Sequence, residues 1–303
     1  ARAAPAPGLG GRGPSSPGPR GHPPRARRGA LGLPGRMCSA AAYHGLSILT
    51  TVSSLRLAHI PVLVVTGSTS LIAMCYVLAT TAGHARVLLP MISDCFRRAP
   101  ESYVAGWGMC SFACVGLLLS VLAMAGYLQR FEAASLADLR LRAASAWLGL
   151  LACTGFGSAS LVTERDDNLV HSAGALVGFF AYYLYGIVLT AALHRCSAAG
   201  AVTRASLGCK VGCLVLGLTA LVAYGVLVAN GALDHTTDGD EAVALCEWLS
   251  VLAMCLFNLS FRLEFSSDLR LMDVWPAAAK SLGAWYGLSA STEPLLAVEP
   301  PTA

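Results

Sequence analysis

Six long apolar stretches constrain this chain more than any other feature of its sequence. Each approaches the roughly 20 residues that a helix needs to cross the hydrocarbon core of a bilayer. Because lipid offers no partners to backbone N–H and C=O groups, continuous apolar runs of this length cross it as α-helices. The sequence therefore predicts an all-α fold, a six-helix transmembrane bundle within residues 57–265. The predicted spans are Leu57–Ala82, Tyr103–Tyr127, Ala143–Thr163, Leu169–Leu193, Leu207–Asn230 and Ala242–Phe261.

The composition excludes a soluble globular protein and disfavours several function classes. Hydrophobic residues make up 55% of the chain and charged residues 13%, whereas soluble domains carry roughly 25% charged residues. Seven arginines fall within residues 1–36, which have no acidic residue, so the remainder is slightly acidic. Nucleic-acid binding through a folded basic face is therefore not expected. The expected partners are the lipid bilayer and unknown proteins, and no motif calls for a cofactor.

The two ends of the chain differ from the apolar centre. Residues 1–36 use almost only Ala, Arg, Gly, Pro, Leu and Ser, and cannot bury enough apolar surface to fold. We interpret them as a disordered tail or as translated upstream sequence, with Met37 as the working start. Residues 37–56 and 266–303 are then predicted to be the cytosolic N-terminal segment and C-terminal tail.

The distribution of Lys and Arg predicts the orientation of the bundle. By the positive-inside rule, loops rich in these residues stay in the cytosol. The fifth loop carries no Lys or Arg and several acidic residues, whereas three arginines in the first loop go against the trend. Both termini and the even-numbered loops are therefore predicted to be cytosolic, and the odd-numbered loops lumenal or extracellular. The even-numbered loops are assigned Arg130, Arg140, Arg142, Arg195 and Arg204.

Several polar residues fall at the predicted lumenal ends of the helices. A carboxylate inside a span costs about 2.5–3.5 kcal/mol on insertion scales, so an acidic residue there calls for an explanation. The candidate site consists of His84, Ser93, Asp94, Glu101, His171 and Glu247.

Three interpretations of these residues remain open from the sequence. They could pair with one another and with backbone at helix ends, and so tie the first loop to the bundle. They could hold a lipid headgroup or an ion. His84, Asp94, His171 and Glu247 could also bind a metal or act as acid and base, although no HExxH, HxxxD or nucleophile-elbow motif supports catalysis.

Cysteine, glycine and aromatic patterns favour structural roles. Most cysteines lie in apolar spans as small apolar residues, so a disulfide framework is not expected, and Cys95 with Cys246 is the one conceivable bridge. Cys38 and Cys196 are candidates for palmitoylation. A GxxxG motif at 174–178 favours close packing between helices of this chain. The aromatic run 257–265 reads as an interfacial anchor, with Arg262 snorkelling.

Several short motifs together carry a family resemblance. The first loop contains Gly83-His84, Leu89-Pro90-Met91-Ile92-Ser93-Asp94 and Pro100-Glu101-Ser102; Val170-His171, Glu247-Trp248 and Glu264-Phe265 follow. In these motifs the chain resembles the damage-regulated autophagy modulator (DRAM) family, within a wider group that includes Sfk-type and GPI-remodelling membrane proteins. One departure is Val162-Thr163-Glu164-Arg165, which stands where family members usually have an Ala-Asn-Phe-Gln-like end to the third helix.

The resemblance implies a multi-pass protein of lysosomal or endosomal membranes that promotes autophagy, influences cell death and has no known catalysis. Other branches of the group imply a different role, namely regulation of phosphoinositide synthesis at the plasma membrane or remodelling of GPI-anchor lipid in the Golgi. The C-terminal tail also contains Leu295 and Leu296 after an acidic residue, a degenerate match to an acidic dileucine sorting signal.

Overall fold

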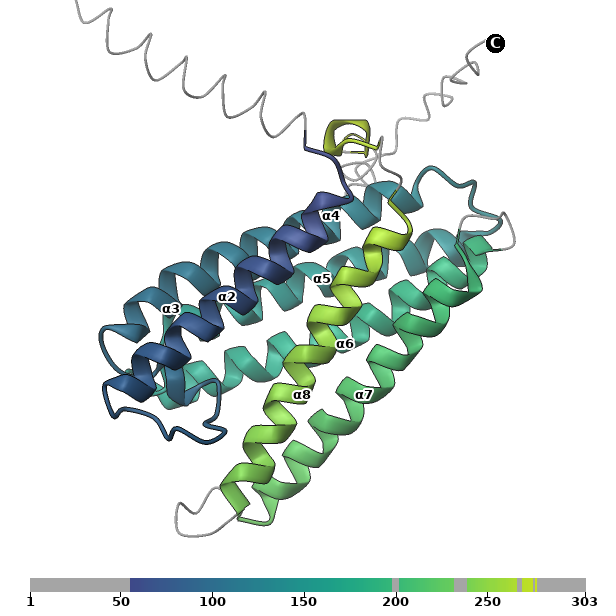
Figure 1. Cartoon of the computed structure of the whole chain (residues 1–303). Coiled ribbons are helices and arrows are strands. Elements are labelled where there is room, and N and C mark those ends of the chain that lie inside the picture. The colour runs from purple at the N-terminus through teal and green to yellow at the C-terminus, as the bar shows by residue number, and fades with distance from the viewer. Residues whose placement is uncertain (1–54, 198–201, 232–238, 266–268, 275, 277–303) are drawn as a thin grey trace, which may run out of the picture. The chain divides into compact units, whose positions relative to one another are not determined.

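The computed structural model describes residues 55–197, 202–231, 239–265, 269–274 and 276 (Figure 1). Within these residues the chain is helical and contains no strand, and six helical segments are long and apolar enough to cross a membrane. The all-α class and the six spans are therefore confirmed, while the side on which the termini lie stays a prediction. The helices are α2 (His59–Thr81), α3 (Glu101–Met109), α4 (Leu117–Leu128), α5 (Leu136–Leu161), α6 (Asn168–Ser197), α7 (Arg204–Ala229) and α8 (Gly239–Leu259).

The second span is one continuous helical segment made of three parts. A π-helical turn over Cys110–Gly116 joins α3 to α4, and the whole span runs over Glu101–Leu128. Such π turns insert an extra residue into the helical repeat and reorient the side chains that follow. Helix α3 begins directly after Pro100, as the Pro-Glu pair at this position predicts.

The third span begins earlier than the sequence predicts. Helix α5 starts at Leu136 rather than at Ala143, and the Oγ atom of Ser135 caps it by accepting the backbone N–H of Asp138 at 3.2 Å. Arg195 lies in the last turn of α6 and Arg204 is the first residue of α7, so their assignment to the fourth loop is wrong. Arg140 and Arg142 likewise lie in α5, and their assignment to the second loop is wrong. Their charge made the first turns look like loop, although a helix end can keep charged side chains outside the hydrocarbon.

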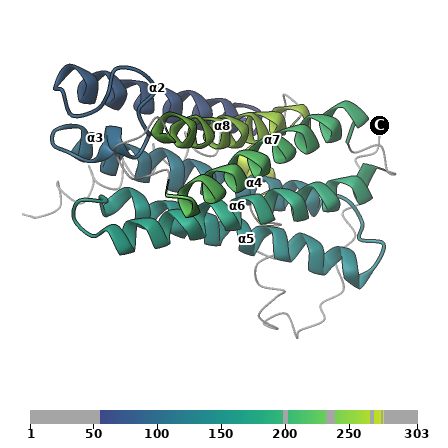
Figure 2. The same cartoon turned by 90° about the horizontal axis from the view of Figure 1, so that it is seen from below.

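Helices α5 and α6 form the closest pair, and a second close pair consists of α7 and α8 (Figures 1 and 2). The GxxxG motif of α6 is used within this chain, because a Cβ atom on Gly155 of α5 would lie 2.4 Å from the backbone nitrogen of Gly178. A Cβ atom on Gly174 would likewise lie 2.9 Å from the backbone nitrogen of Ala159. The two backbones touch at these glycines, as membrane helices do through small residues.

The core of the bundle contains the aromatic residues that the sequence assigns to an interfacial anchor. Phe257 and Phe261 are almost fully buried and stack edge to face with centroids 5.4 Å apart, and Phe265 packs against Tyr127 at 5.8 Å. The interfacial interpretation of 257–265 is therefore wrong. These rings face inward between α4, α6 and α8, because a helix end near the membrane surface can still be enclosed by neighbouring helices.

The segments before α2 and after α8 lie side by side. The backbone N–H of Leu57 donates to the carbonyl of Leu269 at 2.8 Å, and the N–H of Leu271 donates to the carbonyl of Leu55 at 3.1 Å. Leu269, Leu271 and Val274 are buried against the core. The beginning and the end of the bundle are thus joined at one end of it.

Candidate functional site

The first loop connects α2 to α3 and lies at the same end of the bundle as the start of α8 (Figure 1). At the beginning of this loop, the Nδ1 atom of His84 lies 2.5 Å from the Oε1 atom of Glu101. Glu101 is fully buried in the first turn of α3, whereas a quarter of the His84 side chain is exposed (24%). This contact closes the loop by joining its first residues to its last.

Helix α8 holds the middle of the first loop through two neighbouring side chains. The Oε2 atom of Glu247 accepts the backbone N–H of Ile92 at 2.8 Å. The indole Nε1–H of Trp248 donates to the carbonyl oxygen of Pro90, also at 2.8 Å. Pro90 has no N–H to continue a helix, and its free carbonyl is here satisfied by a side chain 158 residues away.

Ser93 and Asp94 lie at the start of a short 3₁₀ turn that an ion pair connects to the third loop, between α5 and α6. Asp94 opens the turn Asp94–Phe96, and its carboxylate lies 3.6 Å from the guanidinium of Arg97. Arg97 also lies 3.6 Å from the carboxylate of Glu164, in the loop between α5 and α6. One of the first-loop arginines that contradict the orientation trend is therefore paired with acidic residues on its own side of the bundle.

His171 faces the end of α5 rather than the other residues of the candidate site. Its Nδ1 atom lies 2.9 Å from the carbonyl oxygens of both Ala159 and Val162. Since carbonyls only accept, this nitrogen carries the proton. His171 and Ser93 share the lining of a cavity of about 20 Å³, which is room for about one water molecule.

The structure thus brings the six candidate residues to one end of the bundle. They form several different contacts there and do not converge on one point. Across the part of the chain that is described, no three His, Cys, Asp or Glu side chains are arranged to hold a metal ion. Cys95 and Cys246 are both free thiols, so the conceivable bridge between them is not formed. Cys95 is buried, and this burial, together with the neighbouring carboxylates of Asp94 and Glu247, raises its pKa to about 12.

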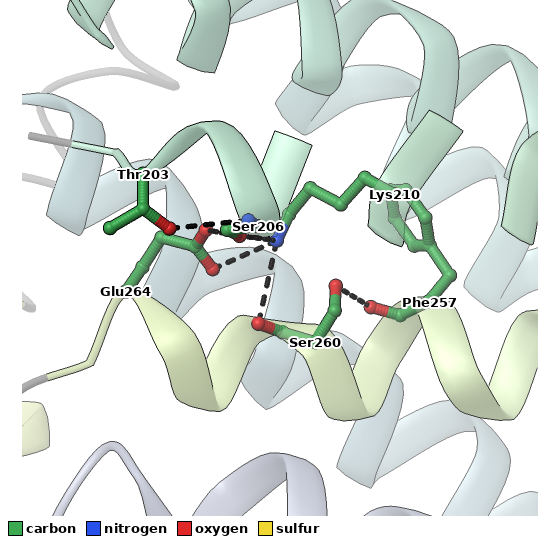
Figure 3. A network of polar contacts seen from close by, with 6 residues as sticks. All are labelled: Thr203, Ser206, Lys210, Phe257, Ser260 and Glu264. Atoms are coloured by element: carbon green, nitrogen blue, oxygen red, sulfur yellow. Dashed lines mark hydrogen bonds and ion pairs between the residues drawn. The ribbon is translucent and has the colours of Figure 1, made fainter. Parts of the chain in front are cut away.

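A second polar network, which the sequence does not predict, lies at the end of the bundle opposite the first loop. Figure 3 shows its residues. The Nζ atom of Lys210 donates to both carboxylate oxygens of Glu264, at 2.9 and 3.0 Å, and to the Oγ atom of Ser206 at 3.1 Å. Ser206 in turn donates to the same carboxylate, and all three side chains are buried. The ammonium also lies 5.4 Å from the ring centroid of Phe261.

The sequence indicates that Lys210 and Glu264 each need a partner, but it does not pair them with each other. Lys210 is a lone cation near the start of an apolar span, and Glu264 is a lone acid at the end of another. Buried charges in membrane helices pair with one another, so each calls for a partner. Sequence alone does not show which of the many charged residues at that end supplies it.

Four other predicted residues lie away from the first-loop end of the bundle or outside the described part of the chain. Cys196 is buried and lies 3.5 Å from a guanidinium nitrogen of Arg142, so its thiol is not exposed for palmitoylation. Cys38, Leu295 and Leu296 lie outside the described residues.

Six apolar helices, whose ion pairs among the described residues lie at helix ends or in loops, define a multi-pass membrane protein. The chain belongs to the Frag1/DRAM/Sfk1/Cwh43P family, whose N-terminal domain profile matches residues 56–267. It is 23% identical to DNA damage-regulated autophagy modulator protein 1 of Mus musculus over 218 residues, which cover 70% of this chain and 92% of that protein. The Xenopus laevis protein of the same name is 25% identical over 227 residues, 69% of this chain and 90% of the relative. No solved structure matches the chain.

Proposed function

We propose that the chain is a non-catalytic protein of lysosomal or endosomal membranes that modulates autophagy, with an influence on cell death. The observation that carries this proposal is the likeness over the whole bundle to proteins named as autophagy modulators, which covers nine-tenths of the mouse and frog relatives. These relatives carry no enzyme name. The first-loop motifs are the most specific part of the resemblance. The motif at 89–94 contains Pro90 and Ile92, whose backbone groups hold this loop to α8.

The candidate site then serves to fix the first loop rather than to bind a ligand. His84 with Glu101, and Glu247 with Ile92, form direct contacts that leave a cavity of about 20 Å³ beside Ser93 and His171. Ligand pockets occupy roughly 300–1,000 Å³, so a lipid headgroup does not fit this cavity. A fixed loop presents a constant surface on one side of the membrane, which suits recognition of a partner protein.

The proposal is tested by locating the tagged protein in cells and measuring autophagic flux after its removal. We expect the protein in lysosomes or endosomes, and a change in the turnover of lipidated autophagosome marker that re-expression restores. Residence in the plasma membrane or Golgi, with unchanged flux, would refute the proposal and favour a lipid-handling role. A Leu295→Ala, Leu296→Ala variant tests the tail, and normal arrival in lysosomes would dismiss the dileucine signal.

A further inference from the structure

A larger cavity lies at the end of the bundle opposite the first loop. It has a volume of about 540 Å³ and is formed by the α4–α5 loop, the first turns of α5 and the last turns of α6. This volume is within the range of roughly 300–1,000 Å³ that small-molecule sites occupy. Its charged lining residues are Arg130, Glu132, Asp138, Arg142 and Arg195.

Arg142 places a fixed positive charge in the wall of this cavity. Its Nη1 atom donates to the carbonyl oxygens of Leu128 at 2.6 Å and Phe131 at 2.8 Å, and the side chain is 4% exposed. These carbonyls belong to the last turn of α4 and the residues beyond it, where the helix dipole favours a cation. Within the described residues no carboxylate lies in ion-pair distance of Arg142. Its charge is compensated by these carbonyl dipoles and, at longer range, by the carboxylate of Asp138.

Arg195 and Arg130 offer free hydrogen-bond donors to the same cavity. The Nη1 atom of Arg195 lies 2.6 Å from the Oδ1 atom of Asp138, and 54% of the Arg195 side chain is exposed, so its other N–H groups remain available. Arg130 is exposed and makes no ion pair with any described residue. Three guanidinium groups against two carboxylates leave the lining with a net positive charge.

We propose that this cavity binds a phosphate monoester, carried either on the headgroup of an anionic lipid or on a free soluble molecule. Guanidinium groups match the geometry of phosphate oxygens and bind them bidentately, and a doubly charged group can be reached by several arginines at once. Basic pockets between membrane helices on the cytoplasmic side suit phosphorylated headgroups. The positive-inside rule assigns this end of the bundle to the cytosol. The proposal is independent of the role in autophagy.

The test uses the full chain in nanodiscs of phosphatidylcholine, with and without a phosphatidylinositol phosphate, and a third sample with inorganic phosphate added. Binding is measured as retained lipid by native mass spectrometry and as the shift in unfolding temperature. Hydrogen bonds to a charged group are among the stronger ones, so we expect the loss of two guanidinium groups in Arg130→Gln with Arg195→Gln to weaken binding tenfold or more. Arg140→Gln, an exposed arginine of α5 outside the cavity, serves as the matched control and should change binding less than twofold.

Comparing the sample that contains the phosphorylated lipid with the sample that contains inorganic phosphate distinguishes the two sources of the phosphate group. A lipid site gives a shift with the phosphorylated lipid that inorganic phosphate does not reproduce, whereas a solute site gives the same shift with inorganic phosphate alone. Arg130→Gln by itself leaves the Arg195–Asp138 pair in place, so its effect reports on the cavity and not on folding. The proposal is overturned if neither phosphate source binds, or if Arg140→Gln weakens binding as much as the cavity variants.

Discussion

The ion pair between Lys210 and Glu264 permits the sharpest test of how this bundle is stabilised. Replacing Lys210 by Met removes a cation that donates to both carboxylate oxygens, at 2.9 and 3.0 Å. Glu264 would keep only the hydroxyl of Ser206 as a side-chain partner while remaining buried. The variant therefore leaves an uncompensated charge inside the protein.

The magnitude follows from the burial of both partners. Removing one member of a buried pair typically costs about 3–5 kcal/mol, whereas replacing both members by apolar residues of similar volume is often neutral or stabilising. We therefore expect Lys210→Met to lower the free energy of unfolding by about 3–5 kcal/mol. The double variant Lys210→Met, Glu264→Met should recover most of that loss, since it removes the stranded charge as well.

The assay is thermal unfolding of the purified protein in detergent micelles. For a chain of this size, 1 kcal/mol corresponds to a shift of about 2–4 °C, so the single variant should unfold roughly 6–20 °C earlier. Arg204→Met is the matched control, because it removes an exposed cation from the same helix and should cost less than about 1 kcal/mol. Additive losses in the double variant would refute the reasoning, since independent sites add and coupled charges do not.

Three further predictions concern other contacts. Gly155→Ala should lower the free energy of unfolding by about 1–3 kcal/mol, because the new Cβ atom would meet the backbone of α6. In the same thermal assay, the control Gly212→Ala should raise the free energy of unfolding by about 0.5–1 kcal/mol, because nothing lies within 4 Å of its new Cβ atom. Cys95, whose burial raises its pKa to about 12, should react slowly with maleimide at neutral pH in the folded protein and rapidly once SDS unfolds it. Glu247→Leu leaves the Ile92 N–H without its acceptor, at a cost of about 1–3 kcal/mol, and should speed tryptic cleavage within the first loop.

The spans could be predicted because their cause is local. A run of about 20 apolar residues is stable in lipid as a transmembrane α-helix, whichever helices surround it. The start of α5 could not be predicted in the same way, because Asp138 and Arg142 make the helix look like a loop. Asp138 pairs with Arg195 of α6, and Arg142 caps α4, so the structure supplies partners that hydropathy does not reveal.

The local shape of the first loop could be predicted from its sequence, but the contacts that hold the loop could not. Its Pro90 and Ser93-Asp94 predict a break followed by a polar turn, and the structure has a 3₁₀ turn beginning at Asp94. That Trp248 and Glu247 would reach the loop backbone depends on the angle between α8 and its neighbours. Such tertiary geometry arises from packing across the whole bundle, so the sequence indicates the polar residues but not their pairing.

Helix α8 and its extension carry two buried or half-buried carboxylates, Glu247 about two turns after the start of α8 and Glu264 beyond its end, and the spacing between them explains how both are tolerated. Glu247 contacts the first loop, and Glu264 contacts Lys210 of α7. Seventeen residues at about 1.5 Å per residue separate them by roughly 25 Å, slightly less than the ~30 Å hydrocarbon core. A segment of this length that is centred in the core places each carboxylate close to a membrane surface, where desolvation costs less than at the centre. The same helix is thus held at both of its ends, to the first loop on one side of the membrane and to α7 on the other.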